Sequence, residues 1–378
     1  MRGMFTVYTG RLPPVKRQRI CSCANNPGLK LGMNAQGERE GIAARGVPLY
    51  GIRRCLEMAV KRIGVLTSGG DAPGMNAAIR SVVRTAAFYG IEVMGIFKGY
   101  DGLINGNMKI LSHRSVSNII NKGGTILRTA RSGEFATAKG RKRAYAVIRK
   151  HKIDGLVLIG GNGTYRGGSV FYKEWGVPCI GVPGSIDNDI SCTDFTIGSD
   201  TAVNTALEAI DKIKDTATSM ERIFVIEVMG RNSGYIAVKV ALGSGAENVL
   251  IPEKNIEIKE ICRDILKGNS KGKTSWIVVV AEGKGRAHEV AARIGLTTGL
   301  ETRVVSIGHI QRGGSPTAAD RILATRLGEK AVDLLRQGAG GKAVGVVSNR
   351  VSTVGLHKAI KEKKEDVNSL CRLINILA

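Results

Sequence analysis

The chain has 378 residues, of which 43% are hydrophobic and 4% aromatic, and it carries a formal net charge of +24 at pH 7. This length leaves room for about two to three domains, and the hydrophobic fraction excludes a largely disordered chain. No segment reaches the roughly 18 consecutive apolar residues of a membrane-spanning helix, so no membrane partner is expected. The positive charge predicts anionic ligands. Because aromatic residues are scarce and the basic residues are spread along the chain, we expect phosphorylated metabolites rather than nucleic acid.

Residues 1–57 differ from the rest of the chain. They hold ten Lys and Arg residues against three acidic ones and show no sustained hydrophobic period. Organelle transit peptides share this composition, but Glu38, Glu40 and scattered glycines and prolines argue against an amphipathic helix. We favour an upstream extension, expected to be disordered, with the functional start at Met58, and keep a targeting segment as the alternative.

The cysteines predict no metal site. All seven lack the regular spacing of zinc ligands, and the pair Cys21 and Cys23 has no second pair to complete a site. We therefore expect reduced thiols in a cytoplasmic protein.

Apolar, β-branched runs recur from residue 61 onward and alternate with helical patterns. The clearest helical pattern spans Thr201–Lys214, with its apolar residues on one face. Continuous apolar strands between helices predict an α/β fold in which parallel sheets are covered on both faces, with ligands beyond the carboxyl ends of the strands. The predicted strands are Arg62–Thr67, Gly155–Ile159, Cys179–Val182, Arg222–Val228, Trp276–Val280 and Arg303–Ile307.

Two glycine-rich loops follow predicted strands. The first, Thr67–Asn76, contains two adjacent glycines that allow a tight turn, and Pro73 suits the first turn of a following helix. The second, Ile159–Tyr165, also follows a strand and precedes a helix. Backbone amides beside a helix N-terminus bind anions, so both loops predict phosphate binding. By contrast, Gly268–Thr274 is one residue shorter than a P-loop and precedes its strand, so we exclude it as a phosphate loop.

Two carboxylates follow a third predicted strand, in the segment Pro183–Asp189. In an extended stretch Asp187 and Asp189 face the same way, so they can converge on one site. Such a pair can accept a proton from a hydroxyl and help to place a metal ion. An Asx turn would explain one of the two aspartates but not both.

Five arginines lie beside glycines or at strand ends, which predicts a shared anionic ligand. The guanidinium group binds phosphate oxygens in a bidentate manner. We interpret His309, which precedes the segment Gln311–Gly314, in the same way. The arginines are Arg131, Arg222, Arg231, Arg303 and Arg312.

Four long motifs together resemble the ATP-dependent 6-phosphofructokinase family of the bacterial (group A) type, and the similarity extends from Lys61 to about Gly345. The resemblance implies a homotetrameric, allosteric enzyme of glycolysis. It also implies two similar Rossmann-like three-layer α/β domains with mostly parallel sheets and the active site in the cleft between them. The motifs are Ser68–Gly74, Pro183–Asp189, Glu227–Arg231 and Gly308–Pro316. The implied domains are residues 58–197 plus 310–360 for ATP and residues 198–309 plus 361–378 for the sugar phosphate.

The resemblance also assigns roles to single residues. Asp187 is the implied general base for the 1-hydroxyl of fructose 6-phosphate, Ser185 keeps a hydroxyl where the family usually has Thr, and Arg231 faces the transferring phosphoryl group. The implied ATP site comprises Gly70, Arg131, Gly161, Asn162, Gly163 and Thr164. The implied sugar-phosphate site comprises Ser185, Ile186, Asp187, Met229, Gly230, Arg231, Glu282, His309 and Arg312, with Arg222 and Arg303 from a neighbouring subunit. Asn162 and Asp187 are the implied magnesium ligands, and Arg80, Arg84, Lys214, Glu247 and Lys273 are the implied effector site.

Departures from the family pattern leave alternatives open. Asn162 replaces an Asp that helps to hold magnesium, which is the only support for a non-catalytic regulatory homologue. In the effector site Lys214 replaces an Arg, and the basic residue near His113 is displaced. Pyrophosphate-dependent relatives carry Asp and Lys at the positions of Gly163 and Gly184, so the two glycines favour ATP as the donor.

Overall fold

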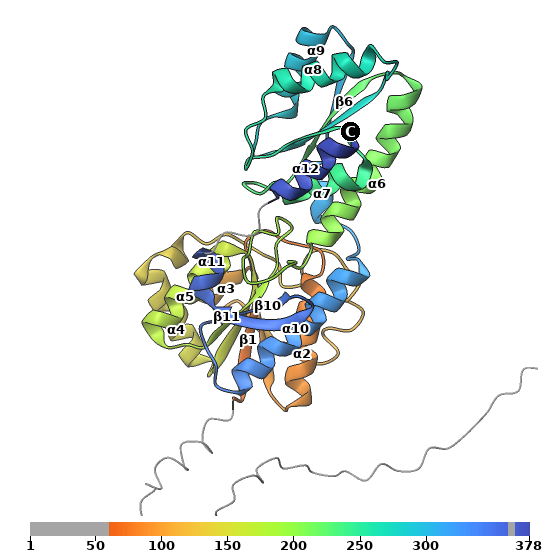
Figure 1. Cartoon of the computed structure of the whole chain (residues 1–378). Helices are drawn as coiled ribbons and strands as arrows, with labels where there is room; N and C mark the ends of the chain where they lie inside the picture. Colours follow the sequence, from red (N-terminus) through yellow and green to blue (C-terminus); the bar gives the residue numbers. More distant parts are fainter. Residues whose placement is uncertain (1–59, 362–366) are drawn as a thin grey trace, which may run out of the picture. The chain divides into compact units, whose positions relative to one another are not determined.

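The computed structural model describes residues 60–361 and 367–378, and two β-sheets organise this part of the chain (Figure 1). The predictions made for residues 1–57 lie outside it. Cys179, Cys192, Cys262 and Cys371 are free and buried, whereas the other three cysteines belong to the segment that is not described. Among the described helices none is long and apolar enough to cross a membrane.

The first sheet has seven strands in the order β11-β10-β5-β4-β1-β2-β3. Neighbouring strands are parallel except at its two edges, where β2 pairs with β3 and β10 pairs with β11 in antiparallel fashion. The strands are β1 (Arg62–Ser68), β2 (Glu92–Ile96), β3 (Met108–Ile110), β4 (Gly155–Gly160), β5 (Cys179–Pro183), β10 (Lys342–Val347) and β11 (Arg350–Gly355).

Helices cover both faces of this sheet because its central strands are apolar on both sides. In β4, Val157 and Ile159 pack into the same core as α2 and α10, whereas Leu156 and Leu158 pack with helices on the other face. Figure 1 shows α2 and α10 on one face and α3, α4 and α5 on the other. The helices are α2 (Met75–Phe88), α3 (Gly99–Asn105), α4 (Ala138–Lys150), α5 (Asn162–Trp175), α10 (Ala318–Arg336) and α11 (Leu356–Lys361), with a 3-10 turn η1 (Glu134–Ala136).

The second sheet has four parallel strands in the order β7-β8-β6-β9. One face packs on α6 and α7, the other packs on α8 and α9, and α12 contacts α7 and β7. Its strands are β6 (Ile223–Val228), β7 (Asn248–Leu250), β8 (Trp276–Ala281) and β9 (Thr302–Ser306). Its helices are α6 (Ser199–Ser219), α7 (Tyr235–Ser244), α8 (Ile258–Asn269), α9 (Ala287–Thr298) and α12 (Asn368–Leu377), with a 3-10 turn η2 (Gly308–Arg312) after β9.

The predicted fold class, two three-layer α/β units with mostly parallel sheets, is confirmed. The predicted strands shift by at most one residue at their ends, since β6 begins at Ile223 and β9 spans Thr302–Ser306. Pro73 lies before the first turn of α2, because the N-cap of that helix is Gly74. The exact domain boundaries stay a prediction, although the strands of each sheet fall within the corresponding predicted parts.

The order of strands in the first sheet places its ligand site. From β1 the chain continues to β2 on one side, whereas from β4 it continues to β5 on the other side. The loops after β1 and β4 therefore diverge and leave a crevice between them, the usual ligand position in an open α/β sheet. Ser68 pairs with Gly160, so these two strands end at the same level.

Candidate active site

A cavity of about 280 Å³ lies where the loops after β1, β4 and β5 meet. It contains both glycine-rich loops and the aspartate pair that the sequence predicted, and it brings them together with Arg131, Arg231 and Arg312. Three segments that are far apart in sequence thus form a single pocket at the carboxyl ends of parallel strands. This is where the fold favours a ligand.

The backbone of the first two loops is closely packed. A Cβ atom at Gly160 would lie 2.5 Å from the Ser68 carbonyl oxygen, which leaves no room for a side chain. The Thr164 hydroxyl donates to the same oxygen at 3.0 Å and is buried. A Cβ at Gly70 would lie 2.7 Å from Arg312 Nη1, which donates to the Asp71 carbonyl oxygen at 2.9 Å. The glycines therefore allow both the contact between the loops and the close approach of an arginine.

Asp187 is a buried carboxylate with an unused oxygen. It is 5% exposed, and its Oδ1 has no hydrogen-bond partner among the described residues, while Oδ2 lies 3.9 Å from Arg231 Nε. Burial and the neighbouring Asp189 raise the pKa of Asp187 to about 6, and Arg312 and Arg231 oppose this shift. The side chain is thus ionised at neutral pH and still basic enough to accept a proton.

Asp187 and Asp189 both line the cavity, but the backbone between them differs from the expected one. The prediction of an extended stretch was wrong, because Asn188 between them has φ 47°, in the left-handed region. Asn188 is 3% exposed, and its Oδ1 accepts from the backbone N–H of Thr196 at 2.9 Å. Asparagine tolerates this conformation better than most residues, and its hydrogen bond stabilises the turn that presents both carboxylates.

Asp189 is held by hydrogen bonds from two loops. Its Oδ1 accepts from Ser185 Oγ at 3.1 Å and its Oδ2 accepts from Asn162 Nδ2 at 2.8 Å. Asn162 Oδ1 is buried and, like Asp187 Oδ1, has no partner in the described part of the chain. Two free oxygens in one cavity fit a hard divalent cation such as Mg²⁺. In the described residues no three His, Cys, Asp or Glu side chains cluster as a metal cage, so such an ion would also need ligands from water or phosphate.

Only three of the five predicted arginines reach the cavity. Arg231 has φ 51°, and its backbone N–H donates to Glu282 Oε1 at 2.9 Å, which fixes the turn after β6. Arg222 and Arg303 do not line the cavity. Both pair instead with Glu301, Arg222 at 2.9 Å. Within one chain the structure thus brings three of the five arginines to one cavity, and a ligand shared with Arg222 and Arg303 of a neighbouring subunit stays a prediction.

The other five residues of the implied sugar-phosphate site lie outside the lining of the cavity, four of them after strands of the second sheet and one, Ile186, after β5 of the first sheet. Met229 is buried and its N–H donates to Gln311 Oε1 at 2.9 Å, which connects the turn after β6 to η2. Ile186 is buried, whereas Glu282 and His309 are exposed. Gly230 follows Met229 with φ 144°.

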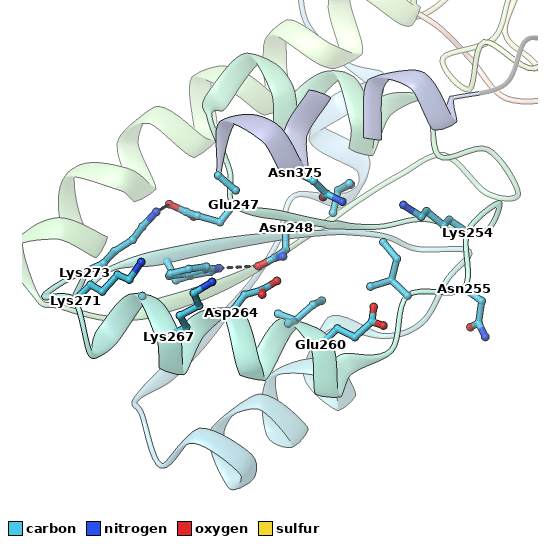
Figure 2. A pocket seen from close by; sticks show the side chains of 16 residues that line it. Glu247, Asn248, Lys254, Asn255, Glu260, Asp264, Lys267, Lys271, Lys273 and Asn375 are labelled. Atoms are coloured by element: carbon cyan, nitrogen blue, oxygen red, sulfur yellow. Dashed lines mark hydrogen bonds and ion pairs between the residues drawn. The ribbon is translucent and has the colours of Figure 1, made fainter. Parts of the chain in front are cut away.

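The residues of the implied effector site do not all line one cavity. Glu247 and Lys273 form an ion pair at 2.7 Å in a second cavity, of about 770 Å³, near β7, β8 and α8. Figure 2 shows lysines and carboxylates along this cavity, and the Lys273 ammonium lies 4.5 Å from the centre of the Trp276 ring. Lys214 donates to the Ser244 carbonyl oxygen at 2.6 Å and, like Arg80 and Arg84 of α2, is not part of the cavity lining.

Sequence reasoning missed several residues of the candidate site. The Tyr100 hydroxyl donates to the Thr164 carbonyl oxygen at 2.6 Å and Ser132 lines the cavity, but a single Tyr or Ser has no sequence signal. Gln311 is 0% exposed and its side chain also donates to the Ala202 carbonyl oxygen at 3.4 Å. Its place within the motif Gly308–Pro316 is the signal that could have identified it.

Comparison with known proteins gives the relatives of this chain. The family model described as "Phosphofructokinase" matches residues 62–335. The chain belongs to the phosphofructokinase family. The "ATP-dependent 6-phosphofructokinase 1" of Thermus thermophilus is 54% identical over 321 residues, which cover 84% of this chain and 100% of the relative. The "ATP-dependent 6-phosphofructokinase" of Bacillus subtilis is 56% identical over 292 residues, 77% of this chain and 91% of the relative.

Solved structures of the family share the fold. Phosphofructokinase from Saccharomyces cerevisiae matches with a TM-score of 0.77 and 34% identity over 83% of this chain, which spans about half (47%) of the yeast chain. A pyrophosphate-dependent phosphofructokinase from Marinobacter aquaeolei matches with a TM-score of 0.72 over 82% of this chain and 86% of that chain. Its identity of 22% supports the fold alone. The resemblance inferred from four sequence motifs is thus confirmed.

Proposed function

We propose that the chain is an ATP-dependent 6-phosphofructokinase, which transfers the γ-phosphoryl group of ATP to the 1-hydroxyl of fructose 6-phosphate and yields fructose 1,6-bisphosphate and ADP, a step of glycolysis. The observation that carries the proposal is the buried carboxylate of Asp187, with a free oxygen, opposite Arg231 in a cavity built from two glycine-rich loops. The relatives that carry the same activity in their names support it.

Asp187 accepts the proton of the attacking hydroxyl. As the hydroxyl O–H bond breaks, its oxygen forms a bond to phosphorus, the bond from phosphorus to the leaving oxygen of ADP breaks, and the proton moves to the Asp187 carboxylate. A pKa of about 6 suits this role, because the group is ionised at neutral pH and its conjugate acid is not too strong.

Cations and backbone amides stabilise the charge that develops on the transferred group. Arg231 lies beside Asp187, and Arg131 and Arg312 line the same cavity. The N-terminus of α5 begins at Asn162 within the second glycine-rich loop, so its amides and its helix dipole favour phosphate oxygens there. The Ser185 hydroxyl hydrogen-bonds Asp189 and keeps the segment before Asp187 in place.

Magnesium, where bound, would be held by Asn162 Oδ1 and the carboxylate of Asp187, whose buried oxygens lack protein partners in the described residues. Its contribution is to neutralise charge on the donor phosphates. Asn162 supplies an oxygen without a charge, so the protein itself contributes less attraction for the ion than an Asp would.

ATP is the donor that the site favours. A Cβ at Gly163 would meet no atom within 4 Å, so a side chain there would occupy open space in the donor cavity. A Cβ at Gly184 would lie 3.0 Å from Met75 Cε, so a lysine there would also displace a buried side chain. Both glycines therefore leave room that a nucleotide donor needs and that pyrophosphate does not need.

A coupled assay of the full chain tests the proposal. Fructose 6-phosphate and Mg²⁺ are supplied, with ATP and pyrophosphate compared side by side. Turnover with ATP alone is expected. Turnover with pyrophosphate would overturn the glycine argument, and no turnover with either donor would favour the non-catalytic regulatory homologue.

We infer that the enzyme is a homotetramer with an effector site. Arg222 and Arg303 lie outside the cavity of their own chain, which supports a role in the site of a neighbouring subunit. Arg80 and Arg84 are one helical turn apart on α2, and burial and the charge of Arg84 lower the pKa of Arg80. Such a pair favours an anion, and the cavity beside Glu247 and Lys273 supplies further polar groups. A cytoplasmic location stays a prediction.

A further inference from the structure

A hydrogen bond joins the two loops that hold the proposed magnesium ligands. Asn162 is the first residue of α5, and Asp189 belongs to the segment after β5. Asn162 Nδ2 donates to Asp189 Oδ2 at 2.8 Å and to the Asp189 carbonyl oxygen at 3.4 Å. Only the NH₂ group of the amide can face a carboxylate, since the opposite orientation would set oxygens against each other. The amide of Asn162 therefore has a defined orientation.

Both carboxylate oxygens of Asp189 accept hydrogen bonds from protein groups, so no ion is needed to pair them. Its second oxygen accepts from Ser185 Oγ at 3.1 Å, so each carboxylate oxygen has one donor. By contrast, Asn162 Oδ1 and Asp187 Oδ1 are buried and have no partner in the described part of the chain. One side of the Asn162 amide thus positions Asp189, and the other side is left for a ligand.

The charges that line the cavity work against a free cation. The lining contains two carboxylates, Asp187 and Asp189, and three arginines, Arg131, Arg231 and Arg312. A free divalent cation entering this set is met by more positive than negative charge. A nucleotide triphosphate is anionic and carries its own metal ion, so it is attracted by the same set.

We propose that Asn162 is a positioning residue that takes the place of a bound cation at Asp189. Its amide N–H holds the carboxylate in the ion-free protein, so the contact between the two loops forms without a divalent ion. The hydrogen bond between Asn162 and Asp189 exists without an ion or a nucleotide. The inference therefore rests on the proposed function only for the identity of these two ligands.

The test replaces the amide by a carboxylate, Asn162→Asp, in the full chain. Two carboxylates would then lie at hydrogen-bonding distance, so in EDTA the Tm is expected to fall by about 3 °C or more, and Mg²⁺ should restore it. Without nucleotide, Mn²⁺ followed by electron paramagnetic resonance should bind the variant at least about tenfold more tightly than the unchanged chain, since a charged oxygen ligand replaces a neutral one. The unchanged chain should show the same Tm in EDTA and in Mg²⁺.

Two further variants control for unfolding and for charge. Asn162→Ala removes the donor without adding an anion, so its Tm should fall in EDTA and Mg²⁺ should not restore it. Asn121→Asp makes the same substitution at an exposed position outside the site and should behave like the unchanged chain.

Tight Mn²⁺ binding by the unchanged chain without nucleotide would overturn the proposal, as would an Asn162→Asp variant with equal Tm in EDTA and in Mg²⁺. Turnover of the unchanged chain with ATP, measured in parallel, reports separately on the proposed function.

Discussion

Asp187 is the residue on which the proposed chemistry depends most directly. Its replacement by Asn keeps the shape of the side chain but removes the proton acceptor, so kcat should fall by about 10²- to 10⁴-fold. Nucleotide binding, measured by calorimetry, should change only a few-fold because Asn retains an oxygen in the cavity. The control Asp211→Asn removes an exposed carboxylate from α6 and should leave kcat unchanged. A kcat within a few-fold of the original for Asp187→Asn would contradict the assignment of the base.

The raised pKa of Asp187 predicts a pH dependence of activity. Because burial and Asp189 raise this pKa to about 6, protonation removes the base as the pH falls through that value. The logarithm of kcat/KM should therefore decline with a slope near one below about pH 6 in a profile measured from pH 5 to 8. An inflection near pH 4, where an ordinary carboxylate titrates, would show that Asp187 is not the base.

The same shift predicts that Asp187 lowers the stability of the fold. A carboxyl whose pKa is higher in the folded than in the unfolded chain binds its proton more tightly when folded, so its contribution to stability is lost as the pH rises from about 4 to 6. Asp187→Asn resembles the protonated form and should raise the free energy of unfolding at pH 7 by up to about 3 kcal/mol. Urea unfolding at pH 7 measures this gain, and a destabilised variant would contradict it.

At the scale of secondary structure, α6 begins with a cap that comes from another helix. Asp320 of α10 is 1% exposed and accepts from the backbone N–H groups of Gly198 and Thr201, at 2.8 and 2.9 Å, and from the Thr201 hydroxyl. Asp320→Ala leaves these buried donors without a partner and should cost about 2–4 kcal/mol in urea unfolding. Glu208→Ala, which removes an exposed ion pair with Lys212 on the same helix, should have little effect. An equally small change in the free energy of unfolding for both variants would show that the Asp320 cap does not stabilise the fold.

Elements could be predicted from the sequence where one short segment contains the whole signal. The buried strands β1, β4, β5, β6 and β8 are continuous apolar runs and were predicted, whereas the largely buried strands β2 and β10 were missed. The edge strand β3 has three residues, two of them exposed, so it has no apolar pattern to detect. The cap of α6 could not be predicted either, because Asp320 is 122 residues from Gly198 in sequence. Likewise, the motifs predicted Asp187 but not the left-handed turn at Asn188 that orients it.

At the scale of the whole molecule, the cavity of one chain holds the proposed base and donor residues but not every proposed sugar-phosphate ligand. Arg131 lines the same cavity as Asp187, whereas Arg222 and Arg303 pair with Glu301 outside it. If the last two arginines act in a neighbouring subunit, each complete site contains residues from two chains. The residue pattern around the five arginines did not separate the two groups, because a motif does not specify which copy of the chain supplies it; the family resemblance did, by assigning Arg222 and Arg303 to a neighbouring subunit.

Hybrid oligomers test this division. Asp187→Asn subunits lack the base, and Arg303→Ala subunits should bind fructose 6-phosphate weakly, so each variant alone should be poorly active at low sugar phosphate. In an equal mixture refolded together, about a quarter of the sites should combine an intact Asp187 with an intact Arg303 from the neighbour and regain activity. The matched mixture of Asp187→Asn with Arg131→Ala should regain none, because both residues belong to the cavity of a single chain. Equal activity in the two mixtures would show that Arg303 serves its own chain or no site at all, and sedimentation of the unchanged protein would show whether a tetramer forms.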